Sequence, residues 1–291
     1  MEVIRKSPAV TRVNFHTEIR QPYSLQPFLL ISDVHFDSPH NQTKLLKKHL
    51  EQAKESGAII FIFGDWFDVM GTHGDPRSKA NEISSRYLSR DFSYLDMVIE
   101  DSADFLRPYA KNIALIGDGN HETKIKQKHD TDPLKRLINL LEEENPAIQH
   151  AGYSGFLELN EILQTGNSSV NSLSTIHFHH GFGGSAPRSK GTLNVDLEAM
   201  QYPGVDFLVR GHIHQKWLME SSVQITVTKA GSIKKRGVTY IQLSSYLDSY
   251  DQGQGGFAIE KNLRPAAPGG YWLNLYRSGR REQEWQVVSA S

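Results

Sequence analysis

The chain has 291 residues, of which 38% are hydrophobic and 22% charged, a composition that excludes collagen-like, coiled-coil and wholly disordered chains. Its 32 lysines and arginines nearly balance its 33 aspartates and glutamates, so binding to a polyanion requires a local basic patch rather than a basic overall charge. Because cysteine is absent, disulfides, thiolate metal sites and cysteine nucleophiles are excluded.

The sequence also lacks the apolar segments that target a protein to a membrane or anchor it there. The first residues, MEVIRKSPAV, do not contain the apolar stretch of a secretory signal, and no run of about 18 apolar residues occurs along the chain. We therefore expect a cytoplasmic protein with no membrane partner.

The first half of the chain alternates apolar runs with segments of helical periodicity. Short apolar runs typical of buried strands occupy residues 28–31, 58–63 and 113–116. Apolar residues at helical spacing occupy residues 41–57, about 79–110 as one long helix or two, and 132–141. Gly57 is suited to end the first of these helices, and Asp132 with Pro133 has the pattern of a helix start. Strands that alternate with helices predict a sheet with helices packed on it.

Beyond Ala147 the chain is rich in predicted strands. Segments with alternating or continuous apolar character occupy residues 156–163, 175–179, 205–209, 223–228 and 238–243. Residues 245–270 are dense in glycine, proline and polar residues, which predicts a long loop with one strand at 257–260. Residues 271–276 and 285–288 flank a polar SGRR turn and predict a terminal hairpin.

Residues of the types that bind metal ions follow five of the predicted strands. The five clusters are Asp33-Val34-His35, Gly64-Asp65-Trp66-Phe67-Asp68, Gly119-Asn120-His121-Glu122, His180-Gly181 and Gly211-His212-Ile213-His214. Because ligands of open α/β sheets bind at the carboxyl ends of strands, we expect these clusters to converge on one site. Side chains two residues apart at a strand end point the same way, so Asp-x-His and His-x-His are each expected to bind one ion from one side.

A single motif of this kind has a high false-positive rate, but the ordered set is specific. D-x-H, GD-x-x-D, GNHE, HG and GHxH resemble, in this order, the calcineurin-like metallophosphoesterase superfamily, from Phe28 to about Leu243. The resemblance implies an α/β fold, a four-layer α-β-β-α sandwich of two mixed β-sheets flanked by helices. We accordingly divide the chain into an N-terminal extension (1–26), a metallophosphoesterase domain (27–245) and a C-terminal loop and hairpin packed on the same domain (246–291).

The resemblance also implies a dinuclear metal site that hydrolyses phosphate esters by attack of a hydroxide bridging two divalent ions. Carboxylate and imidazole ligands without thiolates suit manganese, which we expect, or iron or zinc. Carried over motif by motif, the ligands of one ion would be Asp33, His35, Asp65 and His214. Those of the other would be Asp65, Asn120, His180 and His212, so that Asp65 bridges the pair.

Catalytic roles follow from the same resemblance. His121 would protonate the leaving oxygen or stabilise the charge of the transition state. Glu122 or Asp68 could accept the other ring proton of His121 and fix its tautomer. Asp37 is as consistent with a solvated loop carboxylate as with a residue that supports a ligand.

Two sets of residues keep alternatives open. In the stretch HFHH at 177–180, a shift of one residue in strand register would make His179 the ligand instead of His180. Candidate contacts to substrate phosphates or to a nucleic-acid backbone are Arg188, Lys190, Arg210 and His73. Solvated surface charge is the more common explanation of such basic residues.

The sequence favours a phosphodiesterase or nuclease over two alternatives. This preference depends on GNHE with its histidine, on GHxH, and on a layout similar to the double-strand-break repair nucleases of the superfamily. Those nucleases carry a further DNA-binding cap domain, whereas about 46 residues follow Ser245 here, which argues against a full repair-complex role. One alternative is a phosphomonoesterase acting on a phosphoprotein, a nucleotide or a lipid-sugar. The other is a non-catalytic binding module, against which the complete ligand set argues.

Overall fold

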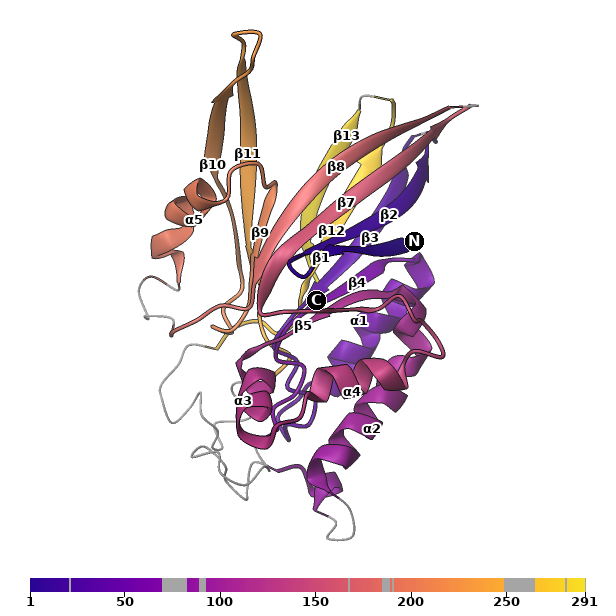
Figure 1. Ribbon diagram of the computed structural model, residues 1–291, viewed down its shortest axis with the longest axis vertical. Helices are drawn as coiled ribbons and strands as arrows, with labels where there is room; N and C mark the ends of the chain where they lie inside the picture. The colour runs from indigo at the N-terminus through magenta and orange to yellow at the C-terminus, as the bar shows by residue number, and fades with distance from the viewer. Residues whose placement is uncertain are drawn as a thin grey trace.

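Two β-sheets lie face to face in the computed structural model, with helices on their outer sides (Figure 1). The structure describes residues 1–20, 22–69, 83–88, 93–166, 168–184, 189, 191–248, 265–280 and 282–290. Both sheets contain parallel and antiparallel neighbours. The predicted α/β fold of two mixed sheets with flanking helices is confirmed.

The seven-stranded sheet has the strand order β1-β2-β7-β8-β9-β11-β10. Its strands are β1 (Glu2–Ser7), β2 (Val10–Glu18), β7 (Ser154–Thr165), β8 (Ser168–His179), β9 (Phe207–Arg210), β10 (Trp217–Val227) and β11 (Ile233–Gln242). The six-stranded sheet has the order β13-β12-β3-β4-β5-β6. Its strands are β3 (Ser24–Ile31), β4 (Ile59–Phe63), β5 (Ile113–Gly117), β6 (Gln149–Ala151), β12 (Tyr271–Arg277) and β13 (Gln283–Ser289).

Helices cover the outer side of each sheet. The longer ones are α1 (Thr43–Ser56), α2 (Tyr94–Leu106), α3 (Asn120–His129), α4 (Pro133–Leu140) and α5 (Val195–Gln201). Short 3-10 helices are η2 (Ser85–Tyr87), η3 (Arg107–Asn112) and η4 (Thr192–Asn194). In Figure 1, α1 to α4 lie beside the six-stranded sheet and α5 lies beside β10 of the other sheet. Among the described residues, no helix is both long and apolar enough to cross a bilayer.

The continuous apolar runs of the sequence form strands that are buried on both faces. In β3, Leu29 and Ile31 face the core beneath the helices, whereas Phe28 and Leu30 face the core between the two sheets. Because the side chains of a strand alternate between its faces, a strand that contributes to two cores needs an apolar residue at every position. This requirement explains why the run was recognisable in the sequence.

Helix boundaries follow local sequence signals. Gly57 ends α1 in the left-handed region at φ 67°, and the side chain of Asp132 accepts a hydrogen bond from the backbone of Lys135 at the start of α4, as expected. The expected helical segment at 79–110 is shorter in the described residues, where α2 ends at Leu106. Pro108 follows within one turn and lacks the N–H that an α-helix requires, so the chain continues as η3.

The two ends of the chain complete the two sheets. β2 pairs in parallel with β7, and β1 pairs with β2, neither of which the sequence analysis anticipated. The predicted terminal hairpin is confirmed as β12 and β13, and β12 also pairs with β3. The predicted strand at 257–260 lies outside the described residues. The division of the chain at residues 26 and 245 stays a prediction.

A buried ion pair joins the sheets. Arg277 of β12 contacts the carboxylate of Glu161 on β7, and Thr17 donates to the same carboxylate at 2.5 Å. The two charged side chains are only 3% and 1% exposed, so neither could be solvated if its partner were removed.

We expect Arg277→Ala to lower the free energy of unfolding by about 3–5 kcal/mol, because it leaves the Glu161 carboxylate buried without its cation. Urea denaturation measures the change. Arg20→Ala is the matched control, since the Arg20–Glu18 pair is exposed and should contribute no more than about 1 kcal/mol. Equal losses in the two variants would show that the buried pair has no special role.

Candidate metal centre

The loops that follow β3, β4, β5, β8 and β9 meet at one edge of the sandwich. Backbone hydrogen bonds connect neighbouring loops, from Asp33 N to the Gly64 carbonyl at 3.0 Å and from His35 N to the Asp65 carbonyl at 3.1 Å. A third connects Gly211 N to the carbonyl of His180 at 3.0 Å. Side chains from segments far apart in the sequence thereby come together, as expected for the carboxyl ends of strands.

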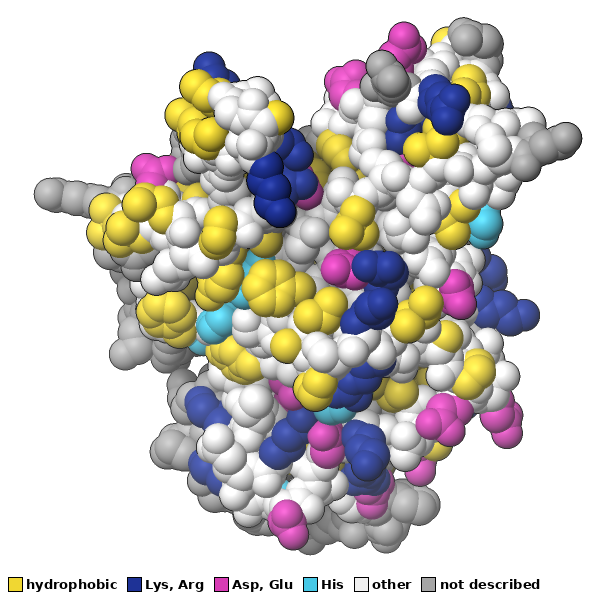
Figure 2. Space-filling model, turned by 45° about the horizontal axis from the view of Figure 1, so that its top comes forward, with side chains coloured by type: hydrophobic (Ala, Val, Ile, Leu, Met, Phe, Trp, Pro, Cys, Tyr) yellow, Lys and Arg dark blue, Asp and Glu magenta, His cyan; other side chains and the backbone are white. Residues whose placement is uncertain are grey.

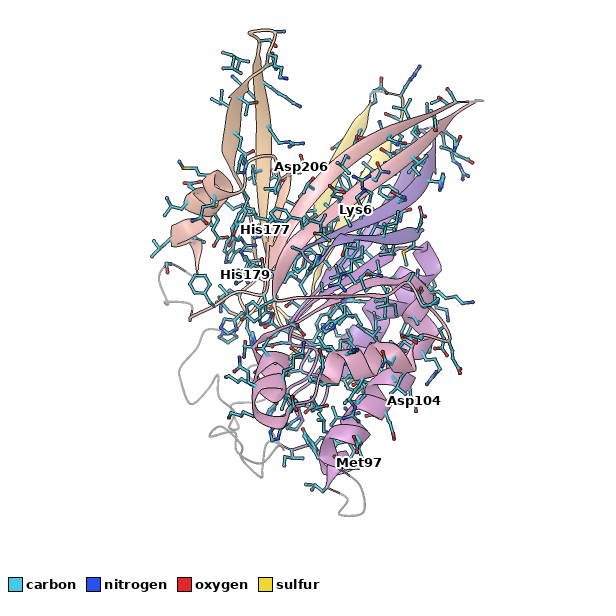
Figure 3. The ribbon with its side chains drawn as sticks, viewed as in Figure 1. Lys6, Met97, Asp104, His177, His179 and Asp206 are labelled. Atoms are coloured by element: carbon cyan, nitrogen blue, oxygen red, sulfur yellow. The ribbon has the colours of Figure 1, made fainter. Side chains whose placement is uncertain are left out.

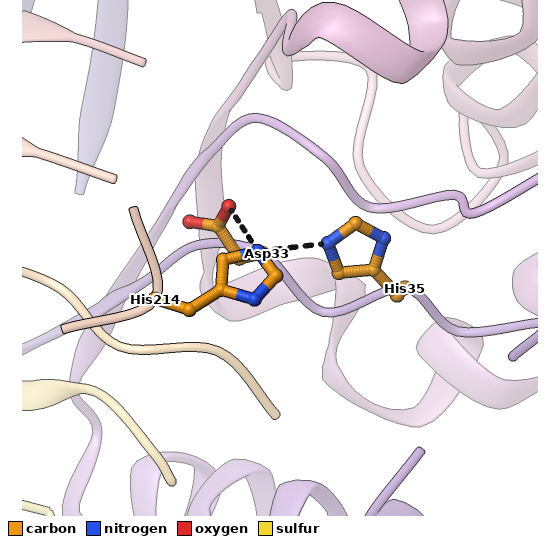
Figure 4. A group of neighbouring side chains, drawn as sticks. All are labelled: Asp33, His35 and His214. Atoms are coloured by element: carbon orange, nitrogen blue, oxygen red, sulfur yellow. Dashed lines mark hydrogen bonds and ion pairs between the residues drawn. The ribbon is translucent and has the colours of Figure 1, made fainter. Parts of the chain in front are cut away.

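One group of potential ligands consists of Asp33, His35 and His214 (Figure 4). Their ligand atoms all lie within 4.8 Å of one another. The Nε2 atom of His214 is 3.2 Å from Asp33 Oδ1 and 3.3 Å from His35 Nε2. The aspartate and His35 are buried, whereas His214 is partly exposed, so the group opens to solvent on one side.

A second group consists of Asp65, His180 and His212, again with ligand atoms within 4.8 Å. His180 Nε2 lies 3.1 Å from Asp65 Oδ2. The same Asp65 oxygen is 4.0 Å from the Nε2 atom of His35, which belongs to the first group. The Asp65 carboxylate therefore lies between the two groups and can contribute to both.

Two buried polar atoms at this edge fit a bound cation. Asn120 Oδ1 is buried without a hydrogen-bond partner among the described residues, and buried His180 Nε2 makes no well-aligned hydrogen bond although Asp65 Oδ2 lies 3.1 Å away. Buried polar atoms are nearly always satisfied, so two such atoms beside two carboxylates indicate a missing positive ligand. Oxygen and imidazole nitrogen are suitable donors for a divalent transition metal. The residues present therefore fit the ions that the sequence motifs imply.

The remote ring nitrogens of the histidines are held by the protein. His180 Nδ1 donates to the carbonyl of Phe63 at 3.0 Å, which leaves Nε2 for the site. His35 Nδ1 lies 3.1 Å from Asp68 Oδ1, and His212 Nε2 lies 2.9 Å from the Gly183 carbonyl. Such contacts orient the ring and select the tautomer of a ligating histidine.

The backbone carries strain at the ligand positions. Five of the candidate ligand residues have φ in the left-handed region, from 48° to 71°: Asp33, His35, Asp65, His212 and His214. Each such conformation costs about 1–3 kcal/mol and is concentrated at functional sites. The strand alternation expected for His-x-His does not hold here, because His212 and His214 belong to different groups. Asp33 and His35 do share one group, as expected.

Close approach of the loops requires glycine at two positions. A Cβ atom at Gly119 would collide with the carboxylate and backbone of Asp65, and one at Gly211 would collide with Ser32 and with the carboxylate of Asp33. Glycine at these positions is therefore a steric requirement of the site.

The charges of the site are mutually dependent. Burial by itself raises the pKa of Asp65, but the positive charges of His180 and His121 lower it by more, to well below its usual value. Burial lowers the pKa of His180, but the carboxylates of Asp65 and Asp33 raise it by more, to about 10. Without metal ions, a proton on His180 thus balances part of the carboxylate charge.

His121 lies beside Asp65 at the start of α3. Its backbone N–H donates to Asp65 Oδ1 at 3.0 Å, and its ring Nδ1 lies 2.6 Å from the backbone carbonyl of Asp68. The Asp68 carboxylate is 3.6 Å from the same nitrogen and has its shorter contact with His35. Asp68 therefore supports both histidines, one through its carbonyl and the other through its carboxylate.

The sequence suggested that Glu122 accepts a ring proton of His121, but its carboxylate binds backbone N–H groups instead. Its fully buried carboxylate accepts backbone N–H groups of Asp65 at 3.1 Å, Phe67 at 3.0 Å and Gly119 at 2.8 Å. Burial and the charge of Asp65 raise its pKa to about 7. Because both oxygens bind backbone, Glu122 connects the loops after β4 and β5 and is not positioned to fix the ring of His121.

The stretch HFHH has a single histidine in the metal groups. His180 lies against Asp65, whereas His179 Nδ1 accepts the backbone N–H of Gly181 at 2.9 Å. His177 stacks on Tyr202 with ring centroids 3.7 Å apart. Figure 3 shows His177 and His179 along β8. The geometry therefore favours His180 over the alternative His179.

Of the four candidate substrate contacts, the structure describes only Arg210, and its guanidinium is bound away from the two groups of potential metal ligands. Arg210 is buried, donates to the carbonyl of Val209 and pairs with Glu198 at 2.5 Å, so its guanidinium is occupied within the protein. Arg188, Lys190 and His73 lie outside the described residues.

Of the groups that support the site, the sequence left Asp37 open as one of two alternatives and did not indicate the others. Asp37 accepts the backbone N–H groups of Asp68 at 2.7 Å and Val69 at 2.8 Å, and it also accepts the hydroxyl of Tyr94 at 2.5 Å. The carbonyls of Phe63 and Gly183 hold ligand histidines. Backbone carbonyls have no sequence signature, and Tyr94 is distant in the chain, so no motif indicated them.

Comparison with known proteins gives a family match. The model of the family described as calcineurin-like phosphoesterase matches residues 26–216. No curated protein matches the chain.

The matches among solved structures include three proteins of low sequence identity. One is described as a predicted phosphoesterase from Streptococcus pneumoniae TIGR4, with 10% identity, 92% of this chain and 91% of that chain covered, and a TM-score of 0.32. The calcineurin-like phosphoesterase YfkN from Bacillus subtilis has 14% identity, 92% coverage of both chains and a TM-score of 0.41. Vps29 complexed with zinc from Entamoeba histolytica has 12% identity, 91% and 100% coverage, and a TM-score of 0.35.

Metal binding should release protons. With its pKa near 10, His180 is protonated at neutral pH in the metal-free protein and must lose that proton to bind an ion through Nε2. We expect manganese to displace at least one proton, and its affinity to rise about tenfold per pH unit between about pH 6 and pH 8. Calorimetric titration in buffers of different ionisation enthalpy counts the protons.

Asn120→Ala is the matched control for this measurement, because it removes a ligand oxygen without removing a titratable group. It should weaken manganese binding and leave the number of released protons unchanged. If the manganese affinity of the wild-type protein did not change with pH, this would contradict the expectation that His180 loses a proton when it binds the ion.

Proposed function

The chain belongs to the calcineurin-like metallophosphoesterase superfamily, and from this premise we propose that it is a phosphodiesterase or nuclease that uses two divalent ions. The observation that carries the proposal is the buried Asp65 carboxylate, which lies between two groups of histidine and aspartate ligands. A carboxylate has two oxygens and can serve two cations at once.

The proposed ligands are the seven residues of the sequence motifs. One ion would be held by Asp33, His35, Asp65 and His214, and the other by Asp65, Asn120, His180 and His212. We propose manganese as the ion, because neutral amide, imidazole and carboxylate donors without sulfur suit it. When bound, such a pair supplies Lewis acidity that activates water and neutralises charge on the phosphate.

His121 is the proposed general acid. Its Nδ1 must carry a proton to donate to the Asp68 carbonyl, so the ring has a proton available at Nε2 only in the imidazolium form. Nε2 lies 4.0 Å from Asp65 Oδ2, on the side of the proposed ions. An imidazolium held in this way can protonate a leaving oxygen, and its positive charge also stabilises negative charge on the phosphate.

This contact supports an ester with a poor leaving group as the substrate, which includes the proposed diesters. The leaving group of a nucleotide or other alkyl diester is a poor one, and its departure depends on a proton donor. A fixed histidine beside the ligands supplies that donor. The parts proposed for Arg188, Lys190 and His73 in holding the substrate stay predictions.

We expect His121→Ala to lower kcat for an alkyl phosphodiester about a hundredfold to ten-thousandfold while manganese content stays close to that of the wild type. The loss should be much smaller for a nitrophenyl ester, whose leaving group needs no proton. His129→Ala, at the other end of α3, is the matched control and should keep full activity. An unchanged rate on the alkyl ester would refute the acid role.

Asp65→Asn should remove activity together with metal binding, because it weakens a ligand that both proposed ions share. Metal analysis and hydrolysis assays on the same preparation measure the two effects. The substrate class is tested with the manganese-loaded wild-type protein on aryl diesters, aryl monoesters, single- and double-stranded DNA, RNA and cyclic nucleotides. A preference for monoesters would indicate a phosphomonoesterase, and no hydrolysis of any ester would indicate a binding module.

A further inference from the structure

β10 and β11 form a hairpin that projects beyond the rest of the seven-stranded sheet (Figure 1). β9 pairs with β11 only from Thr239 to Gln242, and β10 is the edge strand of the sheet. The half of the hairpin nearest its turn therefore has no neighbouring strand on either side among the described residues. From Gln242 to Ile233 the strand extends about 30 Å at 3.3 Å per residue, so the turn lies far from the metal groups.

One face of this distal half carries four exposed aliphatic side chains, with Lys235 among them. In β11, Ile241 points into the core between the sheets, and Ile233 lies on the same face because the two positions are an even number of residues apart. The register adds Val227 opposite Ile233 and Ile225 opposite Lys235. The side chains of Ile225, Val227 and Ile233 are 65%, 73% and 67% exposed, and that of Val223 on the same face is 59% exposed.

The exposed aliphatic face of the hairpin thus continues the inner face of the seven-stranded sheet beyond the point where the six-stranded sheet ends. Near the base of the hairpin the same face is covered by the six-stranded sheet, and farther out nothing described covers it. Four β-branched aliphatic residues on one exposed face form a contiguous patch rather than scattered surface residues, which indicates an interaction surface.

Beyond Glu220, all the charged residues of the hairpin are basic. Between Ser221 and Leu247 the sequence contains no aspartate or glutamate, and it contains Lys229, Lys234, Lys235 and Arg236. Arg236 pairs with Asp206 at 3.0 Å, whereas the three lysines nearer the turn are exposed. Figure 2 shows apolar and basic side chains together on the lobe at the upper left, the side on which Figure 1 places β10 and β11.

We propose that the distal β10–β11 hairpin docks on an anionic phospholipid bilayer. The aliphatic face would enter the boundary between headgroups and acyl chains, and the lysines near the turn would contact the anionic headgroups. This segment is complementary in charge to an anionic surface, because it contains lysines and no acidic side chain that would repel the headgroups.

The observations favour a lipid surface over a nucleic acid. Contacts to a phosphate backbone need the lysines but leave four aliphatic side chains in water, whereas insertion buries them. Residues 221–237 contain no aromatic residue on which a base could stack. A hairpin of this kind also escapes a search for long apolar runs, because alternate residues of its strands are polar.

Docking through the turn would leave the metal groups at the far end of the sheet, accessible from solution. The inference is therefore independent of the proposed hydrolysis, and its test measures binding rather than activity.

The full chain is mixed with vesicles of phosphatidylcholine, with and without phosphatidylserine, and bound protein is separated by flotation. We expect binding to the vesicles with phosphatidylserine, and weaker binding at high salt.

Two sets of variants separate the parts of the hairpin. Val227→Ser with Ile233→Ser should lower the vesicle partition coefficient at least about tenfold. Lys229→Gln, Lys234→Gln and Lys235→Gln should lower it about fivefold for each lysine removed. Val288→Ser, on edge strand β13, is the matched control and should bind as the wild type does. Circular dichroism checks that each variant is folded, which is expected because all these side chains are at least partly exposed.

Insertion can be observed directly because the chain contains no cysteine. A polarity-sensitive dye on Val227→Cys should shift to the blue on vesicles with phosphatidylserine, whereas the same dye on Val288→Cys should not. The proposal is overturned if the wild type does not bind these vesicles, or if the serine variants bind equally well. It is also overturned if the dye stays in water while the lysine variants lose affinity for DNA or RNA, which would make the hairpin a nucleic-acid contact.

Discussion

The burial of the Asp65 carboxylate is the constraint on which the functional edge of this protein depends. A buried carboxylate is stable only with positive partners and hydrogen-bond donors around it. His180 and the backbone N–H of His121 supply some of these, and Glu122 holds the backbone of Asp65 itself. Gly119 has to be a glycine because the carboxylate occupies the space of its side chain. One charged group thus constrains four neighbours, and at Gly119 it also fixes the residue type.

The strain at the ligand positions is carried by a rigid scaffold. Non-glycine residues in the left-handed region are costly, and here they follow strands that are packed on both faces, such as β3 with Phe28 and Leu30 on one side and Leu29 and Ile31 on the other. A close-packed core permits little relaxation, so the loops cannot release their strain by shifting the strands. Divalent ions between the ligands would offset part of that cost, as metal binding does in other sites that are incomplete without it.

The candidate metal site lies far from the face of the hairpin that we propose to contact a membrane. Ligand residues gather at the carboxyl ends of β3, β4, β5, β8 and β9, whereas the exposed aliphatic face lies at the opposite end of β11. The ligand residues come from both sheets, whereas the aliphatic face comes from β10 and β11, which extend beyond the opposing sheet and so expose side chains that would otherwise be core. The same alternation that buries Ile241 leaves Ile233 in solvent.

The sequence by itself determined what depends on local order: apolar runs for strands, Gly57 and Asp132 at helix ends, and the residue types able to bind metal ions. Only the tertiary structure decided what depends on contacts between distant segments. Examples are the pairing of β2 with β7, the separation of His212 from His214 between two groups, the position of His180 rather than His179 beside Asp65, and the use of Glu122 to bind backbone. The physical reason is that periodicity and motifs describe neighbours along the chain. Left-handed backbone, loop contacts and the reach of an opposing sheet arise only when separate segments pack together.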